Sequence, residues 1–346
     1  MPSASPIARV KPPALRSGDT VGIVAPASNI KPEALEAGCQ ALRRLGYKPF
    51  YFASILEQDL YFAGSVQRRV RELEEMFMRD EVRAIVCARG GYGANYLLDK
   101  IGLEKVKSHP KIFVGYSDVT TLLTYFADAA RLVTFHGPMV TKDFAHSDGV
   151  DPASWQAALS GEAEWSVGPE SGVKSLVEGS AEGILYGGCL SMLVASLGTP
   201  YEIQTRGTIL FLEDVAAKPF QIDRMLMQLK LAGKLRDVRG IVFGELLDCV
   251  QSQDQDYTLE QVVSRVVEDL GVPVGYGLRS GHVSRGNVTL PIGVKAELNV
   301  SGRGVSLKML EAATVSDEKK KTTKPTKVHE GAVATRGRLR SPSKRS

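Results

Sequence analysis

Short apolar segments alternate with amphipathic segments along residues 20–135, and this alternation most restricts the folds open to the chain. Val66, Val70, Leu73 and Phe77 recur at helical spacing, which predicts a helix over 66–78 with one buried face. We expect further helices at 33–45 and 119–130, and strands at 20–25, 48–53, 82–88, 112–115 and 132–135. Apolar strands that alternate with helices are typical of a parallel sheet covered on both faces, so the predicted fold class is α/β.

The second half repeats this alternation after a break in the pattern. Residues 146–182 are rich in Gly, Ser, Pro and acidic residues, and we interpret them as a linker with a short helix at 152–159. Beyond it we expect helices at 190–197, 221–231 and 259–270, strands at 208–212 and 240–243, and a β-hairpin of 288–298 and 305–310 around 301–304. The predicted parts are an N-terminal extension (1–14), an N-terminal parallel-sheet domain with flanking helices (15–145), the linker (146–182), a smaller C-terminal α/β domain with the hairpin (183–311), and a tail (312–346).

The tail gives the chain its basic character. Residues 312–346 hold ten Lys or Arg and three acidic residues, so their net charge is +7. The net charge of the whole chain is +4, and the rest of the chain therefore carries −3. The tail has few large apolar residues, which predicts a disordered segment. A basic segment can bind nucleic acid, but we favour a solvated tail and expect no nucleic-acid partner.

Membrane and metal signals are missing from the sequence. No apolar run reaches the ~18 residues that a membrane-spanning helix needs, and the N-terminus lacks the apolar core of a secretory signal. We therefore expect a soluble cytoplasmic protein with no membrane partner.

The four cysteines form no CxxC pair and stand beside no histidine at metal-ligand spacing (Cys39, Cys87, Cys189 and Cys249). This predicts reduced core thiols, no metal site and no cofactor.

Ser117 follows a predicted strand and precedes a predicted helix in the segment GYSDV. A strand-to-helix turn points a hydroxyl away from the sheet, and the N–H groups at the helix start can stabilise an oxyanion. The pattern shares the first half of the G-x-S-x-G nucleophile elbow but lacks its second glycine. The alternative is that Ser117 or Asp118 only caps the following helix.

A reactive serine needs a base and an acid that orients the base. His282, in SGHVSRG, lies between Gly-rich turns and is the best candidate base. The other histidines lie after a strand, before a proline, in the linker and in the tail (His136, His109, His146 and His329). Glu213 ends an apolar strand, where burial beside a histidine is natural; the alternative is a charge near the start of the next helix.

The segment RGGYGAN, residues 89–95, carries a third set of candidates. It lacks the G-x-G-x-x-G spacing of a dinucleotide fingerprint, and GxxxxGK[ST] is absent from the chain. Gly90 and Gly91 let backbone N–H groups approach a substrate oxygen, or they only form a tight turn. Arg89 is a candidate partner for a substrate carboxylate, with a surface arginine as the alternative.

Several segments together resemble the LD-carboxypeptidase family, the muramoyltetrapeptide carboxypeptidases, which also includes the microcin C immunity peptidases. The resembling segments, in the family's order, are KPPALRSGDTVGIVAPAS (11–28), VRAIVCARGGYGANYLLD (82–99), VGYSDVT (114–120), TFHGPM (134–139), GGCLSMLVASLGTP (187–200), LFLEDV (210–215), PFQIDRML (219–226) and VTLPIGVKAEL (288–298). They span roughly residues 11–310, and so many matches in one order make an accidental resemblance improbable.

The resemblance implies a Ser-His-Glu triad in a cleft between two domains. By motif the nucleophile is Ser117, the acid Glu213 and the base His282. It also implies an oxyanion hole of backbone N–H groups from Asp118 and Gly91, with Gly90 as a neighbour. The family often has Phe-Gly-His-Gly where this chain reads Ser-Gly-His-Val at 280–283, a departure that concerns local substrate contacts. The implied reaction is cleavage between meso-diaminopimelate and the terminal D-alanine of muropeptide tetrapeptides in peptidoglycan recycling, by a homodimer without a metal.

Two other functions remain open from the sequence. The microcin-immunity branch acts on peptidyl or aminoacyl nucleotides, which would need an aromatic platform for a nucleobase. Trp155 and Trp165 could form one, although we favour a packing role for both. A non-catalytic binding protein that uses its basic tail is the third hypothesis.

Overall fold

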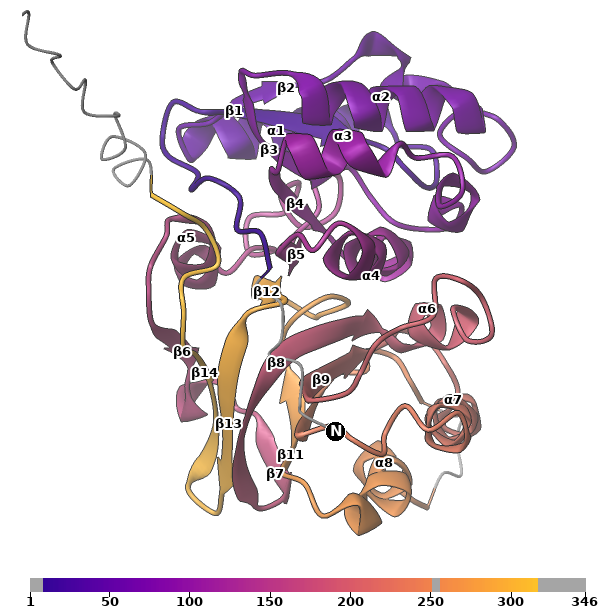
Figure 1. Ribbon diagram of the computed structural model, residues 1–346, viewed down its shortest axis with the longest axis vertical. Coiled ribbons are helices and arrows are strands. Elements are labelled where there is room, and N and C mark those ends of the chain that lie inside the picture. The colour runs from indigo at the N-terminus through magenta and orange to yellow at the C-terminus, as the bar shows by residue number, and fades with distance from the viewer. Residues whose placement is uncertain (1–8, 251–255, 317–346) are drawn as a thin grey trace, which may run out of the picture. The chain divides into compact units, whose positions relative to one another are not determined.

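Two β-sheets organise the part of the chain that the computed structural model describes, residues 9–250 and 256–316 (Figure 1). The first sheet has the order β12-β5-β4-β3-β1-β2, and all its strands are parallel except β12. Its strands are β1 (Thr20–Val24), β2 (Lys48–Phe50), β3 (Val82–Cys87), β4 (Ile112–Gly115), β5 (Thr134–His136) and β12 (Leu290–Ile292). The parallel sheet predicted from the first half of the sequence is confirmed.

Helices cover both faces of the first sheet. They are α1 (Pro32–Arg44), α2 (Val66–Met78), α3 (Leu103–Ser108), α4 (Thr120–Ala129) and α5 (Pro152–Leu159). On one face Leu73 and Phe77 of α2 pack with Phe113 of β4. On the other face Leu35 of α1 packs with Val21 of β1. Burial of both faces explains why these strands are apolar at almost every position.

The second sheet has the order β6-β14-β13-β8-β9-β10-β11-β7. Its strands are β6 (Trp165–Val167), β7 (Lys174–Val177), β8 (Gly179–Cys189), β9 (Thr208–Glu213), β10 (Gly240–Gly244), β11 (Val274–Leu278), β13 (Lys295–Ser301) and β14 (Gly304–Met309). Strands β8 to β11 are parallel and the outer strands are antiparallel. Strand β7, at one end of this sheet, also contacts β13 and β14 near the other end, which shows that the sheet curls. Fold class is therefore confirmed as mixed α/β.

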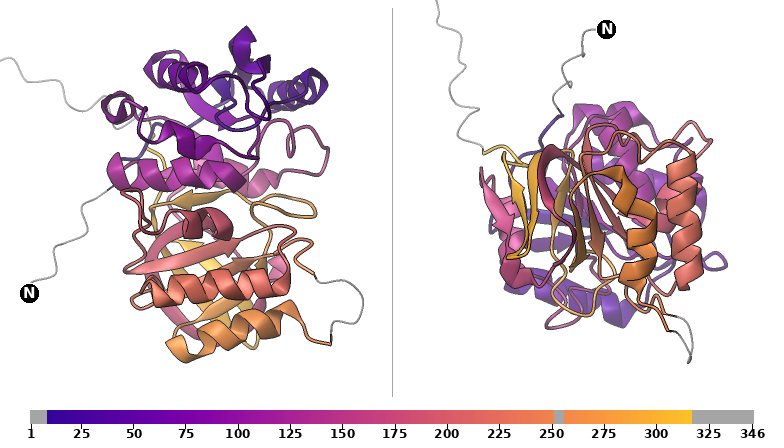
Figure 2. Two further views of the ribbon diagram at one scale, coloured as in Figure 1. Left: turned by 90° about the vertical axis from the view of Figure 1, so that its right-hand side faces the viewer. Right: turned by 90° about the horizontal axis from the view of Figure 1, so that it is seen from below.

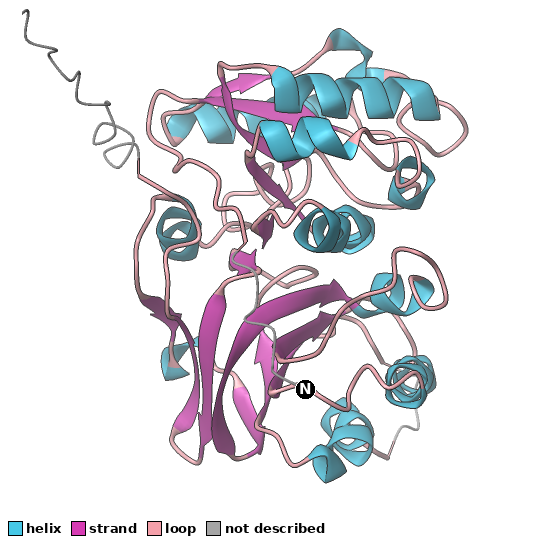
Figure 3. Ribbon diagram, in the orientation of Figure 1, coloured by secondary structure: helices cyan, strands magenta, loops and turns pink. Residues whose placement is uncertain are grey.

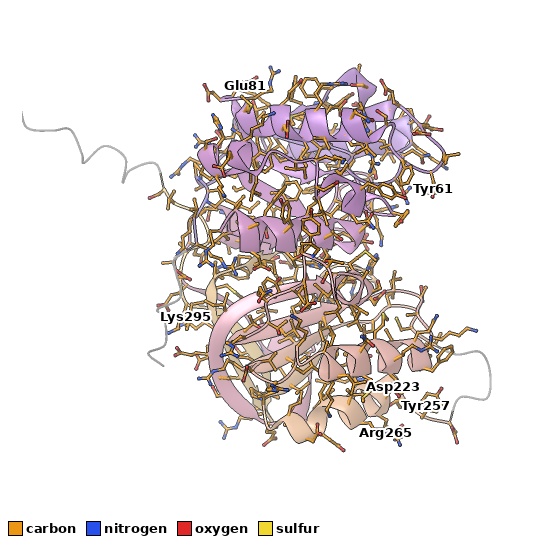
Figure 4. All side chains as sticks on the ribbon, turned by 45° about the vertical axis from the view of Figure 1, so that its right-hand side comes forward. Tyr61, Glu81, Asp223, Tyr257, Arg265 and Lys295 are labelled. Atoms are coloured by element: carbon orange, nitrogen blue, oxygen red, sulfur yellow. The ribbon has the colours of Figure 1, made fainter. Side chains whose placement is uncertain are left out.

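Three helices cover one face of the second sheet, where Figure 2 shows α7 and α8 side by side. They are α6 (Leu190–Ala195), α7 (Pro219–Leu231) and α8 (Leu259–Val267). Leu226 of α7 and Val263 of α8 pack with Phe243 of β10. Short 3-10 helices complete the elements, most of them in connections: η1 (Ala53–Leu56), η2 (Ala94–Leu97), η3 (Ser117–Val119), η4 (Pro169–Ser171) and η5 (Glu268–Leu270). Many charged side chains lie on the outside, such as Lys295, which pairs with Glu182 at 2.5 Å (Figure 4).

One predicted strand is divided between the two sheets. Residues 288–298 were predicted as a single hairpin arm, but β12 pairs antiparallel with β5 and β13 pairs with β8 and β14 (Figure 3). Gly293 separates them at φ +103°, a conformation that favours glycine. The chain therefore passes from one sheet into the other at this point, and this crossing holds the sheets together.

The ends of the predicted parts also differ in detail from the prediction. Residues 146–182 contain the expected α5, but they also supply β6, β7 and the start of β8 to the second sheet. Ala313 and Thr314, predicted to lie in the disordered tail, are buried, and Thr314 donates a hydrogen bond to the Leu159 carbonyl. The rest of that tail, 317–346, lies outside the described residues. In the described part of the chain, every helix is too short or too polar to cross a membrane.

Candidate active site

The predicted catalytic residues stand at or just beyond the carboxyl ends of parallel strands in both sheets. Ser117 follows β4 of the first sheet, Glu213 is the last residue of β9, and His282 follows β11. The carboxyl ends of parallel strands are the usual place for ligands in open α/β sheets. The crossing at Gly293 and the β5–β12 pairing bring the two sets of strand ends together.

Ser117 occupies a strained turn. Its φ is +61°, in the left-handed region that non-glycine residues seldom adopt. Two residues earlier, a Cβ on Gly115 would come within 2.7 Å of Val119 Cγ1, so only glycine lets the strand approach the following helix this closely. Gly115 therefore supplies the room that the tight turn needs, although Val119 stands where the elbow motif has its second glycine.

Glu213 and His282 are directly hydrogen bonded. His282 Nδ1 lies 2.7 Å from Glu213 Oε2, and the same oxygen accepts from the His282 backbone N–H at 3.0 Å. Glu213 is completely buried. Burial alone would raise the pKa of its carboxyl, but the interactions with His282 and His136 outweigh burial and lower that pKa below its ordinary value. Glu213 is thus held as an anion that fixes the imidazole of His282.

Glycines make room for this carboxylate. A Cβ on Gly281 would lie 2.6 Å from Glu213 Cδ, and one on Gly244 would lie 2.6 Å from Glu213 Cβ. Gly281 also has φ +91°. The glycine that precedes His282 is therefore required on two grounds, space and backbone conformation.

One cavity of about 410 Å³ joins the two halves of the candidate site. Tyr116, Ser117 and His282 all line it, and the ring of Tyr116 meets that of His282 edge to face at 5.1 Å. Ser117 and His282 are not hydrogen bonded to each other within the described part of the chain. Catalytic hydrogen bonds often tighten only when substrate is bound, so the shared cavity is the relevant observation. Glu213 is not among the residues that line the cavity, and it is linked to the cavity through its hydrogen bond with His282.

The Gly-rich segment, residues 89–95, lies against the turn that carries Ser117. A Cβ on Gly90 would come within 2.8 Å of Ser117 Cβ and 3.3 Å of the Asp118 nitrogen. Gly91 has φ +102° and is packed on Ser28, whose hydroxyl accepts from the Tyr92 N–H at 3.1 Å. The residues predicted to form the oxyanion hole are therefore neighbours in space.

The side chain of Asp118 fastens these two turns to each other. Its Oδ2 accepts a hydrogen bond from the Ala94 N–H at 2.7 Å, at the start of η2. Burial raises the pKa of the Asp118 carboxyl to about 6, against the lowering effect of the backbone hydrogen bonds from Ala94 and Gly93 and the charge of Arg69. Arg69 is itself buried and donates to the Gly93 and Pro26 carbonyls at 2.8 and 2.7 Å.

The cavity is positively charged. Lys31, Arg89 and Lys142 are among its twelve lining residues, and none of the twelve is acidic. Arg89 donates to the Asn29 carbonyl at 3.3 Å, and the Lys142 Nζ lies 5.6 Å from the centre of the Tyr116 ring. Sequence reasoning named only Arg89, since Lys31 and Lys142 stand in loops without a motif. Such a cavity suits an anionic ligand.

Sequence reasoning also missed the residues that hold the His282 loop. Asn287 accepts from the Gly281 N–H at 2.9 Å and donates to the Gly281 carbonyl at 3.1 Å. It donates as well to Asp143 at 3.2 Å, and Asp143 accepts from the Met139 N–H at 2.8 Å. His136, interpreted from sequence as one histidine among five, touches the other oxygen of Glu213, with Nε2 3.6 Å from Oε1.

The structure also places the four cysteines and the two tryptophans. All four cysteines are free and buried. Cys189 has its sulfur within 4.8 Å of ligand atoms of Glu213 and His282, but a metal bound there would replace the Glu213–His282 hydrogen bond. Trp155 is buried against Phe144, and neither Trp155 nor Trp165 is among the residues that line the cavity of Ser117. The tryptophan platform considered for a nucleobase is therefore not part of this cavity.

Comparison with known proteins identifies the fold and the family. Residues 21–137 match the LD-carboxypeptidase N-terminal domain and residues 182–298 match the LD-carboxypeptidase C-terminal domain. The chain belongs to the LD-carboxypeptidase family. It is 43% identical over 296 residues to a probable murein peptide carboxypeptidase of Bacillus subtilis, covering 84% of this chain and 92% of the relative. It is 27% identical over 330 residues to the microcin C7 self-immunity protein MccF of Escherichia coli, covering 85% and 94%.

A solved structure supports the same assignment. The muramoyltetrapeptide carboxypeptidase from Oxalobacter formigenes has a TM-score of 0.75 at 28% identity, covering 85% of this chain and 99% of that one. The family resemblance inferred from the sequence motifs is thus confirmed.

Proposed function

We propose that this protein is a serine-type LD-carboxypeptidase that releases the terminal D-alanine from muropeptide tetrapeptides containing meso-diaminopimelate. One observation carries the proposal. A strained serine and a histidine held by a buried glutamate open onto one cavity, which three cationic side chains and no acidic side chain line (Lys31, Arg89 and Lys142). A carboxypeptidase must bind a free carboxylate beside the scissile bond, and this cavity offers both the chemistry and the charge.

The proposed reaction proceeds through an acyl-enzyme. His282 takes the proton of Ser117 through Nε2, while Glu213 holds Nδ1–H and stabilises the imidazolium that forms. Ser117 Oγ attacks the carbonyl of meso-diaminopimelate, and backbone N–H groups of Asp118 and Gly91 bind the oxyanion. His282 then protonates the nitrogen of the leaving D-alanine. A water molecule, deprotonated by His282, releases the shortened peptide.

The substrate class follows from charge and from the relatives. The terminal D-alanine and the side chain of meso-diaminopimelate each carry a carboxylate, which gives the cationic residues Lys31, Arg89 and Lys142 two anionic groups to bind near Ser117. Identity to the Bacillus murein peptide carboxypeptidase is 43%, against 27% to MccF, so the murein peptide is the preferred substrate over aminoacyl nucleotides. Location in the cytoplasm and assembly as a homodimer remain predictions, testable by fractionation and by light scattering.

Mass spectrometry of purified tetrapeptide incubated with the protein tests the proposal. We expect release of D-alanine by the wild type and none by Ser117→Ala. The same peptide with a C-terminal amide should react much more slowly, because it lacks the terminal carboxylate. An aminoacyl sulfamoyl adenosine serves as the substrate of the alternative branch. Unchanged D-alanine release by Ser117→Ala would refute the assignment of the nucleophile.

A further inference from the structure

The carboxylate of Glu213 lies between two imidazoles, and only one of them belongs to the predicted triad. Oε2 is occupied by His282, while Oε1 faces Nε2 of His136 at 3.6 Å. Both His136 and Glu213 are completely buried. His136 Nε2 and Glu213 Oε1 each lack a hydrogen-bond partner among the described residues. Two buried polar atoms that face each other and have no other partner require an explanation.

The second nitrogen of His136 fixes where its proton lies. Nδ1 stands 3.0 Å from the hydroxyl oxygen of Ser280, and that hydroxyl donates to the Val288 carbonyl at 2.7 Å. A hydroxyl has one proton, so Ser280 can only accept from His136, and Nδ1 must carry a hydrogen. In a neutral ring Nε2 would then present a lone pair to a carboxylate oxygen. A proton on Nε2 makes the same contact attractive.

We propose that His136 is a positioning residue of this site: as an imidazolium anchored by Ser280, it pairs with Oε1 of Glu213 and keeps Oε2 turned toward His282. The inference rests on the serine-peptidase function proposed above. His136 has no place in the lining of the cavity, so it acts through Glu213 and not on the substrate.

The position of His136 suits this role because it belongs to the sheet that carries the nucleophile. It ends β5, which pairs with β4 through Gly115, two residues before Ser117. Glu213 ends β9 of the second sheet. The pair therefore links the half of the site that holds the serine with the half that holds the base. Gly281 admits this contact, since a Cβ there would lie 2.8 Å from His136 Cε1.

Few other titratable groups face His136. Glu213 approaches from β9, and the ring of Tyr116 lies 5.9 Å away at the end of β4. Phe211 of β9 and Ser280 also contact His136, Leu290 of β12 pairs with it, and none of these three side chains titrates near neutral pH. His282 and Cys189 stand beyond Glu213. A positive charge on His136 would therefore act mainly on Glu213 and, through it, on the protonation of His282.

Two substitutions separate the roles of the two ring nitrogens. The amide nitrogen of Gln reaches about where Nε2 stands, and that of Asn reaches about where Nδ1 stands. His136→Gln keeps a donor to Glu213 and loses the bond to Ser280, whereas His136→Asn does the reverse. We expect His136→Asn to lower kcat for D-alanine release roughly 100-fold, as expected for a misplaced catalytic group, with KM little changed. His136→Gln should retain about ten times more activity than His136→Asn.

The pH profile gives a readout that a purely structural role would not change. Loss of a positive charge beside Glu213 makes protonation of His282 easier, so the acid limb of kcat/KM should move to higher pH in both variants. Equal activities, higher activity in His136→Asn than in His136→Gln, or an unmoved acid limb would overturn the proposal. If wild type releases D-alanine while His136→Asn is normal, the positioning role fails and the proposed function stands.

A spectroscopic measurement does not depend on activity. In the wild-type protein labelled with nitrogen-15 at histidine, both ring nitrogens of His136 should carry hydrogen near neutral pH, with His136→Gln used to assign the signal. An Nε2 without hydrogen would contradict the proposal even if no substrate were turned over. This result is independent of the test on Ser117→Ala.

Discussion

Gly90→Ala adds one methyl group at the contact between the Gly-rich segment and Ser117. Gly90 has an ordinary backbone conformation, so alanine is not strained by φ, and the effect is one of space alone. The new Cβ would stand 2.8 Å from Ser117 Cβ and 3.0 Å from Ser117 Oγ. Carbon atoms in contact keep about 3.5–4.0 Å, so Ser117 or the loop must move by roughly 0.7 Å or more.

The size of the effect follows from that displacement. A misplacement of about 1 Å in a catalytic group can cost about 100-fold, which corresponds to roughly 2.7 kcal/mol of transition-state stabilisation. The same movement separates the Asp118 N–H, 3.3 Å from the new Cβ, from the place where the oxyanion forms. We therefore expect kcat/KM for D-alanine release to fall about 100-fold, mainly through kcat.

Steady-state kinetics with purified tetrapeptide, together with thermal unfolding, measures this effect. Gly302→Ala is the matched control, because a Cβ there meets only the flexible tip of Glu178 at 3.4 Å. We expect the control to keep wild-type activity. A Gly90→Ala variant that stays folded and within twofold of the wild-type kcat/KM would refute the packing of this segment on Ser117.

Three further predictions concern charge and metal. Burial gives Asp118 a folded-state pKa of about 6, above its ordinary value, so the contribution of Asp118 to stability should fall as pH rises from about 4 to 6. Across that window Asp118→Asn should gain about 3 kcal/mol relative to wild type in urea unfolding, and parallel pH profiles of the two proteins would contradict this. Lys142→Met should raise KM about tenfold with little change in kcat, because a cation that faces the substrate carboxylate is lost, and equal KM values would remove Lys142 from substrate binding. Dialysis against a chelator should leave D-alanine release unchanged, since the proposed mechanism uses only side-chain and backbone groups, and activity restored by added metal would oppose it.

The fold and the candidate catalytic residues could be predicted from the sequence because strand ends and family motifs are local signals. The apolar runs before Ser117 and Glu213 mark strands, and the Ser-Asp, Glu-Asp and Gly-His pairs stand where those strands or loops end. The carboxyl ends of parallel strands gather at one edge, so the candidates could be placed together before any coordinates were known.

The remaining features depend on contacts between distant segments. His136 and Ser280 are 144 positions apart, and nothing in TFHGPM indicates that its histidine would meet Glu213. The division of 288–298 between two sheets was hidden because this segment reads as one mainly apolar strand, although Gly293 at φ +103° marks the break in the structure. Lys31 and Lys142 meet at the cavity only because α1 and the loop after β5 flank the same strand ends.

Labelling with a fluorophosphonate, followed by peptide mapping, tests most directly whether Ser117 is a nucleophile activated by His282 and Glu213. We expect one modified residue, Ser117, with labelling lost in Ser117→Ala and strongly slowed in His282→Ala and Glu213→Gln. Modification of another residue, or labelling of Ser117 at the wild-type rate in both of the latter variants, would contradict it.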